Sequence, residues 1–471
     1  MRRTKIICTI GPSSEKPEIF FKMAEAGMNV VRLNLSHGSQ QEHGARIDLV
    51  KQYRKETGKS MGLLLDTRGP EIRLGIMKDD VQLIEGSRYT LTTVEMVGDD
   101  ERASITYKGL PKDVQKGDDI LIDDGLIHLR VESVQDKDIV CTVINGGPLG
   151  SQKGVNIPGV HVKLSDISAK DKSDILFGIK NGIDFVAASF VQGAEDIFRL
   201  KDFLRSNGGN DIHVIAKIET REAVNNVDSI LEVADGIMVA RGDLGVEIAI
   251  EEVPIAQKAV IKKCNTAGKP VIVATQMLDS MIRNPRPTRA EANDVAGAVY
   301  DGADAIMLSG ETASGKYPLE ALQTMDRIAQ AVEASIDYAR KIMGRQPKSG
   351  TTITDAISTA SCTIAISLGA SAILTPTKSG YTARMVSKHR PSCPIIALPI
   401  DERTFHKLSL IWGVMPMLTL KTKDTDELLE QCMKNAIENG MVKKGDILVI
   451  TAGVPLNVSG ATNLIKVQRA E

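Results

Sequence analysis

The chain has 471 residues, and this length predicts about three domains rather than one compact core. Hydrophobic residues make up 42% and charged residues 25%, and the formal net charge is −2. This composition is typical of a globular protein, and it argues against a basic nucleic-acid-binding or membrane-binding surface. Aromatic residues, at 3%, are also too scarce to form base-stacking platforms. We therefore expect no nucleic-acid partner and no membrane partner.

The six cysteines are scattered along the chain without a CxxC pair. This spacing favours free thiols in a reducing compartment over a disulfide framework or a zinc site. No apolar run is long enough to cross a bilayer. Residues 1–8 are basic and then strand-like, without the apolar stretch of a signal peptide. We expect a cytoplasmic protein.

Eight short, apolar, β-branched segments alternate with longer helical patterns. This alternation is typical of βα units, and eight of them favour an α/β fold with a closed (β/α)8 TIM barrel over an open sheet. The predicted strands are residues 5–10, 29–35, 62–66, 185–190, 213–219, 236–240, 270–275 and 305–308. Predicted helices include residues 17–26, 170–181, 197–206, 254–267 and 289–301.

The composition changes between the third and fourth predicted strands. Short runs there alternate apolar and polar residues, and an Asp-Asp-Gly turn signal occupies residues 123–125. A structureless loop of this length is uncommon in a compact protein. We predict an all-β lid domain, residues 70–168, inserted into a barrel that consists of residues 1–69 and 169–343.

A polar segment with Pro and Gly, residues 345–350, is typical of a linker. After it the α/β pattern resumes, with a predicted helix at residues 355–368 and predicted strands at 372–375, 395–398 and 447–451. We predict a C-terminal α/β domain, residues 344–471.

Charged and hydroxyl-bearing residues follow six of the eight predicted barrel strands. In βα barrels the carboxyl ends of the strands carry the catalytic groups, so we expect these residues to converge on one face. In chain order these residues, with the amides that stand among them, are Arg32, Asn34, Ser36, His37, Asp66, Thr67, Arg68, Lys217, Glu219, Arg241, Asp243, Thr275, Gln276, Ser309 and Glu311.

Glu219 and Asp243 follow adjacent predicted strands. Two accessible carboxylates suit Mg²⁺, which completes its coordination with water and substrate oxygens. Lys217 shares a face with Glu219 because alternate strand residues point the same way, and Arg32 follows the second strand. Such cations stabilise a phosphoryl group in transfer. For any one of these residues a structural ion pair is the alternative, and the spacing alone does not separate a kinase from an aldolase.

Residues 310–316 have the spacing of a P-loop, but Tyr317 stands where that motif needs a Ser or Thr for Mg²⁺. Pro318 follows immediately, and the preceding strand is the eighth of the predicted barrel. We therefore do not expect a P-loop nucleotide site.

Longer stretches around these residues resemble the pyruvate kinase family, in its bacterial form without an extra C-terminal phosphohistidine-type domain. The stretches keep the order of the family and cover essentially the whole chain. They are residues 28–38, 65–73, 153–159, 215–219, 237–247, 274–281, 284–292 and 307–313.

The resemblance implies transfer of the phosphoryl group of phosphoenolpyruvate to ADP, giving pyruvate and ATP in the final step of glycolysis. It implies that Glu219 and Asp243 hold Mg²⁺ or Mn²⁺, and that Lys217 and Arg32 bind the phosphoryl group. It places Gly242, Asp243 and Thr275 against the substrate. Since a threonine hydroxyl is a poor acid, we expect Thr275 to pass a proton to the enolate carbon through water.

The resemblance also implies a K⁺ site and a nucleotide site. The K⁺ residues are Asn34, Ser36, Asp66 and Thr67, and the nucleotide residues are Asn34, His37, Lys59, Arg73 and Lys153. Members of the family that need K⁺ carry Glu at the position of Glu71, so we expect K⁺ activation. Lys153 belongs to the predicted lid, which would close over ADP, and a solvated lysine on a turn is the alternative.

A loop in the C-terminal part combines hydroxyl groups, a lysine and backbone N–H groups before a helix that we expect to begin at Ala383. Such a loop makes a phosphate-binding nest, and a plain N-cap turn is the alternative. In the resembling enzymes it binds the phosphate of an allosteric sugar phosphate or nucleotide. Its residues are Thr377, Lys378, Ser379, Gly380, Tyr381 and Thr382. Residues 454–463 lack the Trp and Arg that hold fructose 1,6-bisphosphate in animal enzymes, so the effector is not identified.

Two other functions stay open at this point. An Mg²⁺-dependent pyruvate-enolate aldolase or lyase would share Glu219 and Asp243 but would need no lid, K⁺ site or nucleotide contacts. A catalytically idle sugar-phosphate sensor is opposed by the presence of Lys217 and Thr275 together with both acids. Because the family is usually tetrameric, we expect a homotetramer.

Overall fold

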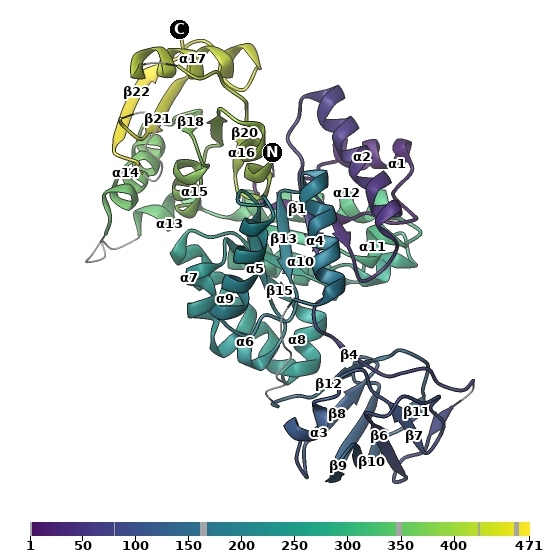
Figure 1. Cartoon of the computed structure of the whole chain (residues 1–471). Helices are drawn as coiled ribbons and strands as arrows, with labels where there is room; N and C mark the ends of the chain where they lie inside the picture. Colours follow the sequence, from purple (N-terminus) through teal and green to yellow (C-terminus); the bar gives the residue numbers. More distant parts are fainter. Residues whose placement is uncertain (1, 80, 161–166, 345–350, 423, 456–460) are drawn as a thin grey trace.

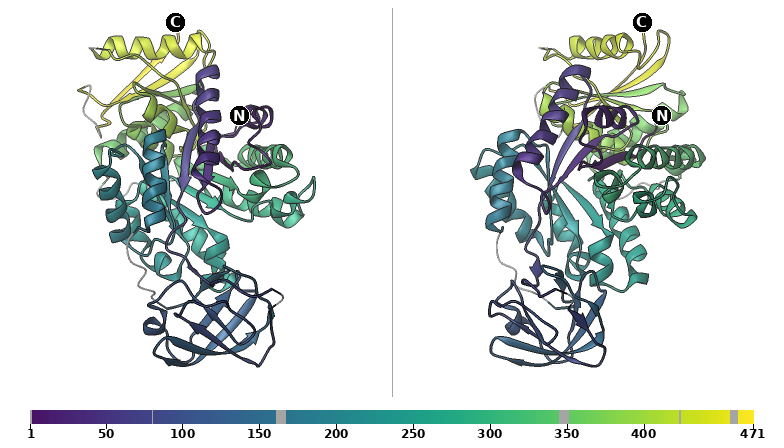
Figure 2. Two further views of the ribbon diagram at one scale, coloured as in Figure 1. Left: turned by 45° about the vertical axis from the view of Figure 1, so that its right-hand side comes forward. Right: turned by 90° about the vertical axis from the view of Figure 1, so that its right-hand side faces the viewer.

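The computed structural model describes residues 2–79, 81–160, 167–344, 351–422, 424–455 and 461–471. Three parts lie along one direction: a β-rich part at one end, a βα barrel in the middle and an α/β part at the other end (Figure 1). The two further views keep the barrel between the other two parts (Figure 2). Within the described ranges, no helix is long and apolar enough to cross a membrane.

Eight parallel strands close into a barrel in the order β1-β17-β16-β15-β14-β13-β3-β2. Nearly all of their residues are buried, as expected for strands covered on both sides. The bounds are β1 Lys5–Thr9, β2 Val30–Asn34, β3 Gly62–Asp66, β13 Phe185–Ala188, β14 His213–Ile218, β15 Gly236–Ala240, β16 Val271–Ala274 and β17 Ala305–Leu308. All eight predicted strands are therefore present, and their ends differ from the prediction by at most two residues.

Helices and short 3-10 turns surround the barrel. They are α1 Pro17–Glu25, α2 Gln40–Thr57, α4 Ala169–Asn181, α5 Ala194–Ser206, α6 Arg221–Asn225, α7 Val227–Val233, α8 Arg241–Glu247, η1 Ile250–Glu252, α9 Val253–Ala267, η2 Asp279–Ile282, α10 Arg289–Asp301, α11 Gly310–Ala313 and α12 Pro318–Ser335. Local sequence fixes several of their ends. Ser39 and Glu42 form a capping box at the start of α2, and Thr288 and Glu291 form one at the start of α10.

The inserted part is a seven-stranded sheet with a small second sheet and its own apolar core. The large sheet has the order β4 Ile72–Arg73, β12 Gly154–Asn156, β8 Asp119–Ile122, β9 Ile127–Gln135, β10 Asp138–Asn145, β6 Arg88–Thr92 and β7 Arg102–Ser104; the small sheet is β5 Gln82–Leu83 with β11 Gly147–Pro148, and α3 spans Leu110–Asp113. Between β8 and β9, Asp123 and Asp124 take φ values of 55° and 56°, at the turn that the sequence predicts. Residues 161–166, near the end of the predicted lid, lie outside the described residues.

The C-terminal part has a five-stranded sheet in the order β20-β19-β18-β21-β22, in which only β22 is antiparallel to its neighbour. Its elements are α13 Tyr338–Met343, α14 Ile353–Ser367, β18 Ala372–Thr377, α15 Tyr381–Lys388, β19 Ile395–Pro399, α16 Glu402–Lys407, η3 Leu408–Leu410, β20 Val414–Pro416, α17 Thr425–Glu438, β21 Ile447–Ala452 and β22 Leu464–Arg469. The α/β fold class, with its barrel and additional sheets, is confirmed. The predicted linker at 345–350 lies outside the described residues.

Three predicted helix starts are too late in the chain. α5 begins at Ala194 instead of residue 197, and α14 begins at Ile353 instead of residue 355. α15 begins at Tyr381, two residues before Ala383, because Gly380 ends the loop in the left-handed conformation with φ of 78°. A Cβ at Gly380 would also lie 3.1 Å from the side chain of Leu408, so glycine suits this position both conformationally and sterically. The loop residues Tyr381 and Thr382 are thus the first residues of the helix.

The C-terminal part packs against the amino ends of the barrel strands. Nζ of Lys5, at the start of β1, donates a hydrogen bond to the carbonyl of Val414 at 2.6 Å. Arg390 donates to Asp304, at the start of β17, at 2.9 Å and to Asn265 at 2.7 Å. These contacts leave the carboxyl ends of the strands facing the inserted part, and this arrangement fixes the place of the candidate site.

Lys5 generates a prediction about stability and pH. Burial, together with the charge of Arg2, lowers the pKa of Lys5 from 10.5 to about 7. The unfolded chain therefore binds more protons than the folded chain between these pH values, so the free energy of unfolding of the wild type should rise with pH across this window. Lys5→Met should flatten that rise, and its relative gain in stability should be largest below pH 7.

Denaturant unfolding at both ends of this pH window measures the effect. Lys434→Met is the matched control, because Lys434 is exposed on α17 and its one ion pair within the described part of the chain is with Glu438, four residues along the same helix. The control should keep the slope of the wild type. An unchanged slope in Lys5→Met would contradict the assignment.

Candidate active site

Four charged side chains meet at the carboxyl ends of β2, β3 and β14. Nε of Arg32 lies 2.7 Å from Oδ2 of Asp66, and Nζ of Lys217 lies 3.3 Å from Oδ1 of the same carboxylate. Nζ of Lys217 also lies 2.7 Å from Oε1 of Glu219. All four residues are buried, with exposed fractions between 1% and 8%. The two cations and two anions balance one another, as buried charges must.

The strand register brings these residues together. Arg32 is the register partner of Thr9 on β1, and its Nη1 donates to Oγ1 of Thr9 at 2.9 Å. Asn34 is the register partner of Asp66 on β3. Side chains that are far apart in the sequence thus become neighbours at one rim of the barrel, as the rule for barrel strand ends predicts.

The neighbouring charges set the protonation of the cluster. Burial lowers the pKa of Lys217, but the negative charges of Asp66 and Glu219 outweigh it and hold that pKa above its usual range. Burial raises the pKa of Asp66, but the charges of Lys217 and Arg32 outweigh it and lower that pKa. Glu219 differs, because burial, opposed by Lys217 and reinforced by the charge of Asp243, raises its pKa to about 7. Lys217 therefore stays charged, while Glu219 lacks a full counter-charge.

Ser189 and Phe190, after β13, complete the cluster. The hydroxyl of Ser189 accepts a hydrogen bond from Nζ of Lys217 at 2.7 Å and donates to the carbonyl of Thr67 at 2.7 Å. The backbone N–H of Phe190, which has φ of 55°, donates to Oε2 of Glu219 at 2.6 Å. Sequence reasoning missed Ser189, as it missed Thr9. Both residues stand at the ends of the two strands for which no site residue was predicted, so applying the strand-end rule to all eight strands would have found them.

Thr275 and Gly242 meet across the ends of β16 and β15. The N–H of Gly242 donates to Oγ1 of Thr275 at 2.8 Å, and this hydroxyl donates to the carbonyl of Ala274 at 2.6 Å. Thr275 has φ of 69°, an unusual value for a β-branched residue. Nη2 of Arg241 donates to the carbonyl of Thr275 at 2.7 Å and helps to hold this conformation. Asp243 lies in the first turn of α8, directly after β15. β15 is the neighbour of β14, which carries Lys217 and is followed by Glu219.

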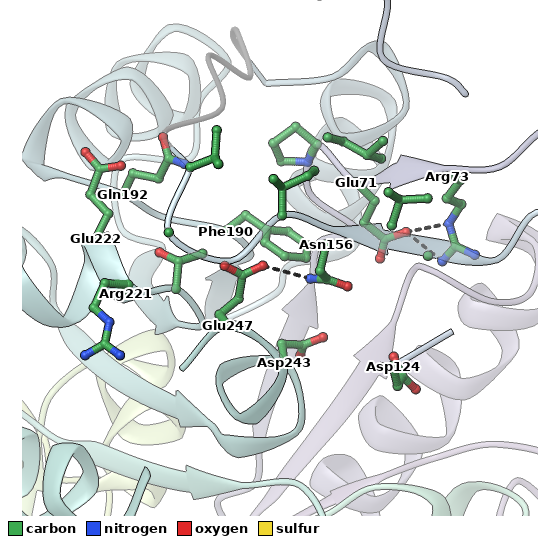
Figure 3. Close-up of a pocket in the computed structure, with 18 of the residues that line it drawn as sticks. Glu71, Arg73, Asp124, Asn156, Phe190, Gln192, Arg221, Glu222, Asp243 and Glu247 are labelled. Carbon is green, nitrogen blue, oxygen red and sulfur yellow. Dashed lines mark hydrogen bonds and ion pairs between the residues drawn. The ribbon is translucent and has the colours of Figure 1, made fainter. Parts of the chain in front are cut away.

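A cavity of about 580 Å³ lies between this rim and the inserted part (Figure 3). On the inserted side, Glu71 holds Arg73 with its carboxylate 2.7 Å from Nε, and Nζ of Lys153 lies 2.8 Å from Oδ2 of Asp123. A hydrogen bond of 3.0 Å from Nδ2 of Asn156 to Oε1 of Glu247 crosses from the inserted sheet to α8 (Figure 3). Asp243 also lines the cavity. Arg73, Lys153 and Asp243 are thus brought to one space.

The acids of this rim suit a divalent ion that brings other ligands with it. Within the described ranges, no group of three or more His, Cys, Asp or Glu side chains could hold a metal. Burial raises the pKa of Glu219 and the charge of Asp243 adds to the rise, and a bound cation would offset both effects. Mg²⁺ is commonly held by one or two carboxylates plus water and substrate phosphates, so these two residues fit it.

The residues expected at a K⁺ site also lie together. Asp66 and Thr67 are buried after β3, and Asn34 and Ser36 are half-buried after β2. Oδ1 of Asn34 accepts a hydrogen bond from the N–H of Ser36 at 3.2 Å, which folds this turn over the strand end. His37 follows with an exposed side chain. The set offers oxygen atoms of mixed charge, as a monovalent cation requires.

Lys59 lies away from these residues. It follows the end of α2 and precedes β3, so it is at the amino end of the barrel, and the next residue, Ser60, donates a hydrogen bond to the carbonyl of Phe405 in the C-terminal part at 2.8 Å. The carboxyl end of β3 carries Asp66 instead. The expected contact of Lys59 with a nucleotide at the active site is therefore not supported by the geometry.

The loop of residues 377–382 lies at the carboxyl end of β18 and at the start of α15. The carbonyl of Lys378 accepts a hydrogen bond from Oγ1 of Thr404 on α16 at 3.3 Å. Thr382 is buried, and its hydroxyl lies 3.0 Å from the hydroxyl of Thr462. The loop therefore joins three segments of the C-terminal part. Residues 456–460, within the segment 454–463 that lacks the Trp and Arg of the animal enzymes, lie outside the described residues.

Comparison with known proteins gives a consistent result. The family model described as pyruvate kinase, barrel domain, matches residues 1–322, and the one described as pyruvate kinase, alpha/beta domain, matches residues 355–468. A pyruvate kinase of Clostridium acetobutylicum is 52% identical over 473 residues, covering 100% of both chains. One from Geobacillus stearothermophilus is 53% identical over 469 residues, covering 99% of this chain and 80% of its own length.

A solved structure agrees with these matches. A crystal structure described as a pyruvate kinase from Cryptosporidium parvum has a TM-score of 0.93 and 39% sequence identity, and the match covers 100% of this chain and 96% of that chain. The identity is near one half over the full chain, and both domain models match. The barrel rim described above agrees with these matches. The chain belongs to the pyruvate kinase family.

Proposed function

We propose that this phosphotransferase moves the phosphoryl group of phosphoenolpyruvate to ADP and forms pyruvate and ATP. The observation that carries the proposal is the buried rim in which Asp66 holds Arg32 and Lys217 beside the carboxylate of Glu219. The relatives are pyruvate kinases that match 99% to 100% of this chain, and nothing in the comparisons supports an aldolase or lyase. The intact rim likewise argues against an idle sensor.

Lys217 and Arg32 would bind the phosphoryl group during transfer. The transferring group spreads negative charge over three oxygens, and catalysis is largely a matter of positioning and electrostatic stabilisation. Lys217 is suited to this because Ser189, Asp66 and Glu219 fix its ammonium group and keep it charged. Arg32 is fixed in the same way by Asp66 and Thr9. Both donors are thus oriented before the substrate arrives.

Pyruvate kinases generally use Mg²⁺ and K⁺. We propose that Glu219 and Asp243 hold Mg²⁺ or Mn²⁺, with Gly242, Asp243 and Thr275 against the substrate. A divalent ion at these carboxylates would supply the positive charge that neutralises substrate oxygens. The oxygen atoms of Asn34, Ser36, Asp66 and Thr67 would hold K⁺ beside the rim.

Thr275 would pass a proton to the enolate carbon through a water molecule. Its hydroxyl is held between the N–H of Gly242 and the carbonyl of Ala274, so its position at the rim is defined. Because a threonine hydroxyl is too weak an acid to donate its own proton readily, its role is to orient the water. The half-buried setting of Thr275 suits a relay to solvent.

Asn34, His37, Arg73 and Lys153 would contact the nucleotide. Arg73 and Lys153 line the cavity from the inserted side, where Glu71 and Asp123 hold them. We propose that residues 70–168 form a lid, that residues 1–69 and 169–343 form the catalytic barrel, and that residues 344–471 form a regulatory domain. Closure of a lid over the nucleotide would exclude water from the phosphoryl group.

We further propose that the 377–382 loop binds the phosphate of an allosteric metabolite, that the enzyme is a homotetramer and that it is cytoplasmic. The loop's place at a helix start favours a phosphate, because backbone N–H groups there are unpaired within the helix. The free, buried cysteines among the described residues suit a reducing compartment.

The first test replaces Lys217. Lys217→Met should lower turnover at least about a hundredfold, because it removes a charge that stabilises the transferring group. It also leaves Asp66 and Glu219 without a counter-charge, so Lys217→Arg is needed as a variant that keeps the charge. Coupled assays of ATP formation should show this loss of turnover in Lys217→Met, and denaturant unfolding should show that only this variant is strongly destabilised. Lys217→Arg should keep more turnover than Lys217→Met, because it keeps the charge. Near-normal turnover in Lys217→Met would sink the assignment.

Ser189 provides a sharper test of positioning. Ser189→Ala removes one acceptor from Nζ of Lys217 and should lower kcat about tenfold, the size expected for one hydrogen bond to a charged group, with little change in the KM for phosphoenolpyruvate. Ser189→Thr should restore much of kcat. Ser229→Ala is the control and should leave both constants unchanged. It removes an exposed hydroxyl on α7 that donates to the carbonyl of Asn226 and has no other hydrogen bond to a described residue. A loss confined to KM would argue against positioning of Lys217.

Glu71 tests the dependence on K⁺. Glu71→Lys would place a fixed ammonium group at the mouth of the site and should make activity largely independent of K⁺. Glu71→Gln removes the negative charge without supplying a cation, so it should keep the requirement for K⁺. Initial rates across a K⁺ titration, at constant ionic strength, measure both. Undiminished activation of the lysine variant by K⁺ would count against the proposal.

A further inference from the structure

A second cavity lies at the amino end of the barrel, at the other end of β14 from Lys217. Its volume is about 330 Å³. Part of its lining comes from the C-terminal end of α5, the loop that follows α5, and His213, the first residue of β14. Lys407, the last residue of α16, lines it from the C-terminal part. The cavity therefore lies between the barrel and the C-terminal part, because its lining includes residues of α5 and α16. Figure 1 shows that α5 belongs to the barrel layer and α16 to the C-terminal part.

Three cationic side chains line this cavity: Lys201 and Arg205 from α5 and Lys407 from α16. Two carboxylates, Asp211 and Asp235, are also present. On formal charge alone the lining is positive by one unit. What decides its preference for a ligand is how far these two acids are already engaged.

Both acids are engaged by other groups. The carboxylate of Asp235 accepts from Nζ of Lys201 at 2.9 Å and from the N–H of Val214 at 2.8 Å. The carboxylate of Asp211 pairs with Arg403, on α16, at 2.7 Å. Arg403 does not line the cavity, so part of the negative charge of Asp211 is balanced outside it, as part of the positive charge of Arg205 is balanced outside it by Asp202. The lining therefore keeps a net positive charge of one unit.

The remaining cations have weak partners. Nζ of Lys407 donates to the carbonyl of Asp211 at 2.9 Å, which is a neutral acceptor. Among the residues that the structure describes, Arg205 pairs with Asp202 alone, three residues earlier on α5, and both side chains are about 70% exposed. Such an exposed pair contributes little and is readily exchanged for a better partner.

His213 is a neutral member of the lining. Burial is the main cause that lowers the pKa of His213 to about 4, and the charges of Lys407, Arg384 and Lys201 lower it as well, against that of Asp235. The imidazole is therefore neutral at neutral pH and adds no charge of its own.

We propose that this cavity binds a small phosphate monoester that bridges the barrel and the C-terminal part. A phosphate dianion suits two ammonium groups and a guanidinium, and a guanidinium can bind it through two parallel hydrogen bonds. The volume exceeds that of a bare ion and lies at the lower end of the range for small-molecule sites, which leaves room for a polyol of a few carbons. Asn210 and His213 would offer hydrogen bonds to its hydroxyl groups.

The site would connect two elements that already reach functional regions. α16 carries Lys407 at its end and, through Thr404, a hydrogen bond to Lys378 of the 377–382 loop. β14 begins at His213 and reaches Lys217 at the barrel rim. A ligand that joins Lys407 to α5 and β14 would tie the C-terminal loop to the catalytic strand. This binding site is distinct from the 377–382 loop and does not depend on the proposed role of that loop.

The test measures protection of individual lysines from acylation, read by mass spectrometry of the whole chain. Glycerol 3-phosphate should protect Lys407 and Lys201 in a saturable way, inorganic phosphate should protect them more weakly, and citrate should protect them least. Stronger protection by citrate than by either phosphate would overturn the choice of ligand class. Absence of saturable protection by glycerol 3-phosphate would overturn the site.

Variants separate this site from other anion sites. Arg205→Gln leaves both labelled lysines in place and should weaken protection about tenfold, the size of one charge-assisted hydrogen bond, with unchanged basal turnover. Lys434→Gln removes one positive charge from an exposed ion pair on a helix. In this variant the ligand should protect Lys201 and Lys407 as well as it does in the wild type. Lys378→Gln should also keep protection. Loss of protection in Lys434→Gln would show a bulk charge effect, and loss in Lys378→Gln would show an indirect effect of the loop; either result would refute the proposal.

Discussion

The active site depends on the mutual neutralisation of four buried charges. Asp66 is the shared member, because its two carboxylate oxygens face Arg32 and Lys217 separately. Removing one partner from a buried ion pair lowers the free energy of unfolding by about 3–5 kcal/mol. Replacing the whole pair by well-packed apolar residues often leaves that free energy unchanged. Such a cluster is therefore a poor way to stabilise a barrel. Its presence at the strand ends is better explained by the need to hold two cations ready for an anionic substrate.

The two ends of the barrel strands carry different sets of groups. β14 shows this most clearly, since His213 at its start lies in the junction with the C-terminal part and Lys217 near its end lies in the catalytic rim. At about 3.3 Å per residue the strand carries these side chains well apart, and a packed parallel strand is a stiff connection. A change in the junction can thus reach the rim without a long chain of flexible contacts.

Much of the fold could be predicted from the sequence, because the barrel strands are fully buried and read as short β-branched runs between helical patterns. The rule that strand ends carry the chemistry then brought Arg32, Asp66, Lys217 and Glu219 together. Thr9 and Ser189 were missed because one hydroxyl at a strand end looks like any group that meets water. Lys59 was assigned from family resemblance alone, although it precedes its strand instead of following it.

Other features had no signal in the sequence. The helix start at Tyr381 depends on Gly380 in the left-handed conformation, and the neighbouring hydroxyl groups gave equally good candidates for a cap. The φ of 55° at Phe190 aims its N–H at Glu219, and nothing in a phenylalanine predicts that conformation. Backbone geometry of this kind follows from the packed rim and not from local preference.

Backbone strain at the rim is held by the same polar network that holds the charges. Phe190, Thr275 and Gln276 are non-glycine residues with positive φ, a conformation that costs about 1–3 kcal/mol each. Two of them have a partner that fixes the strained peptide: Glu219 accepts from the N–H of Phe190, and Arg241 donates to the carbonyl of Thr275. Glu219 therefore both carries charge for the site and shapes the loop beside it. Glu219 thus acts on the rim through its hydrogen bond as well as through its charge. Removing the carboxylate abolishes both effects at once, so only a variant that keeps the carboxylate and changes its position separates them.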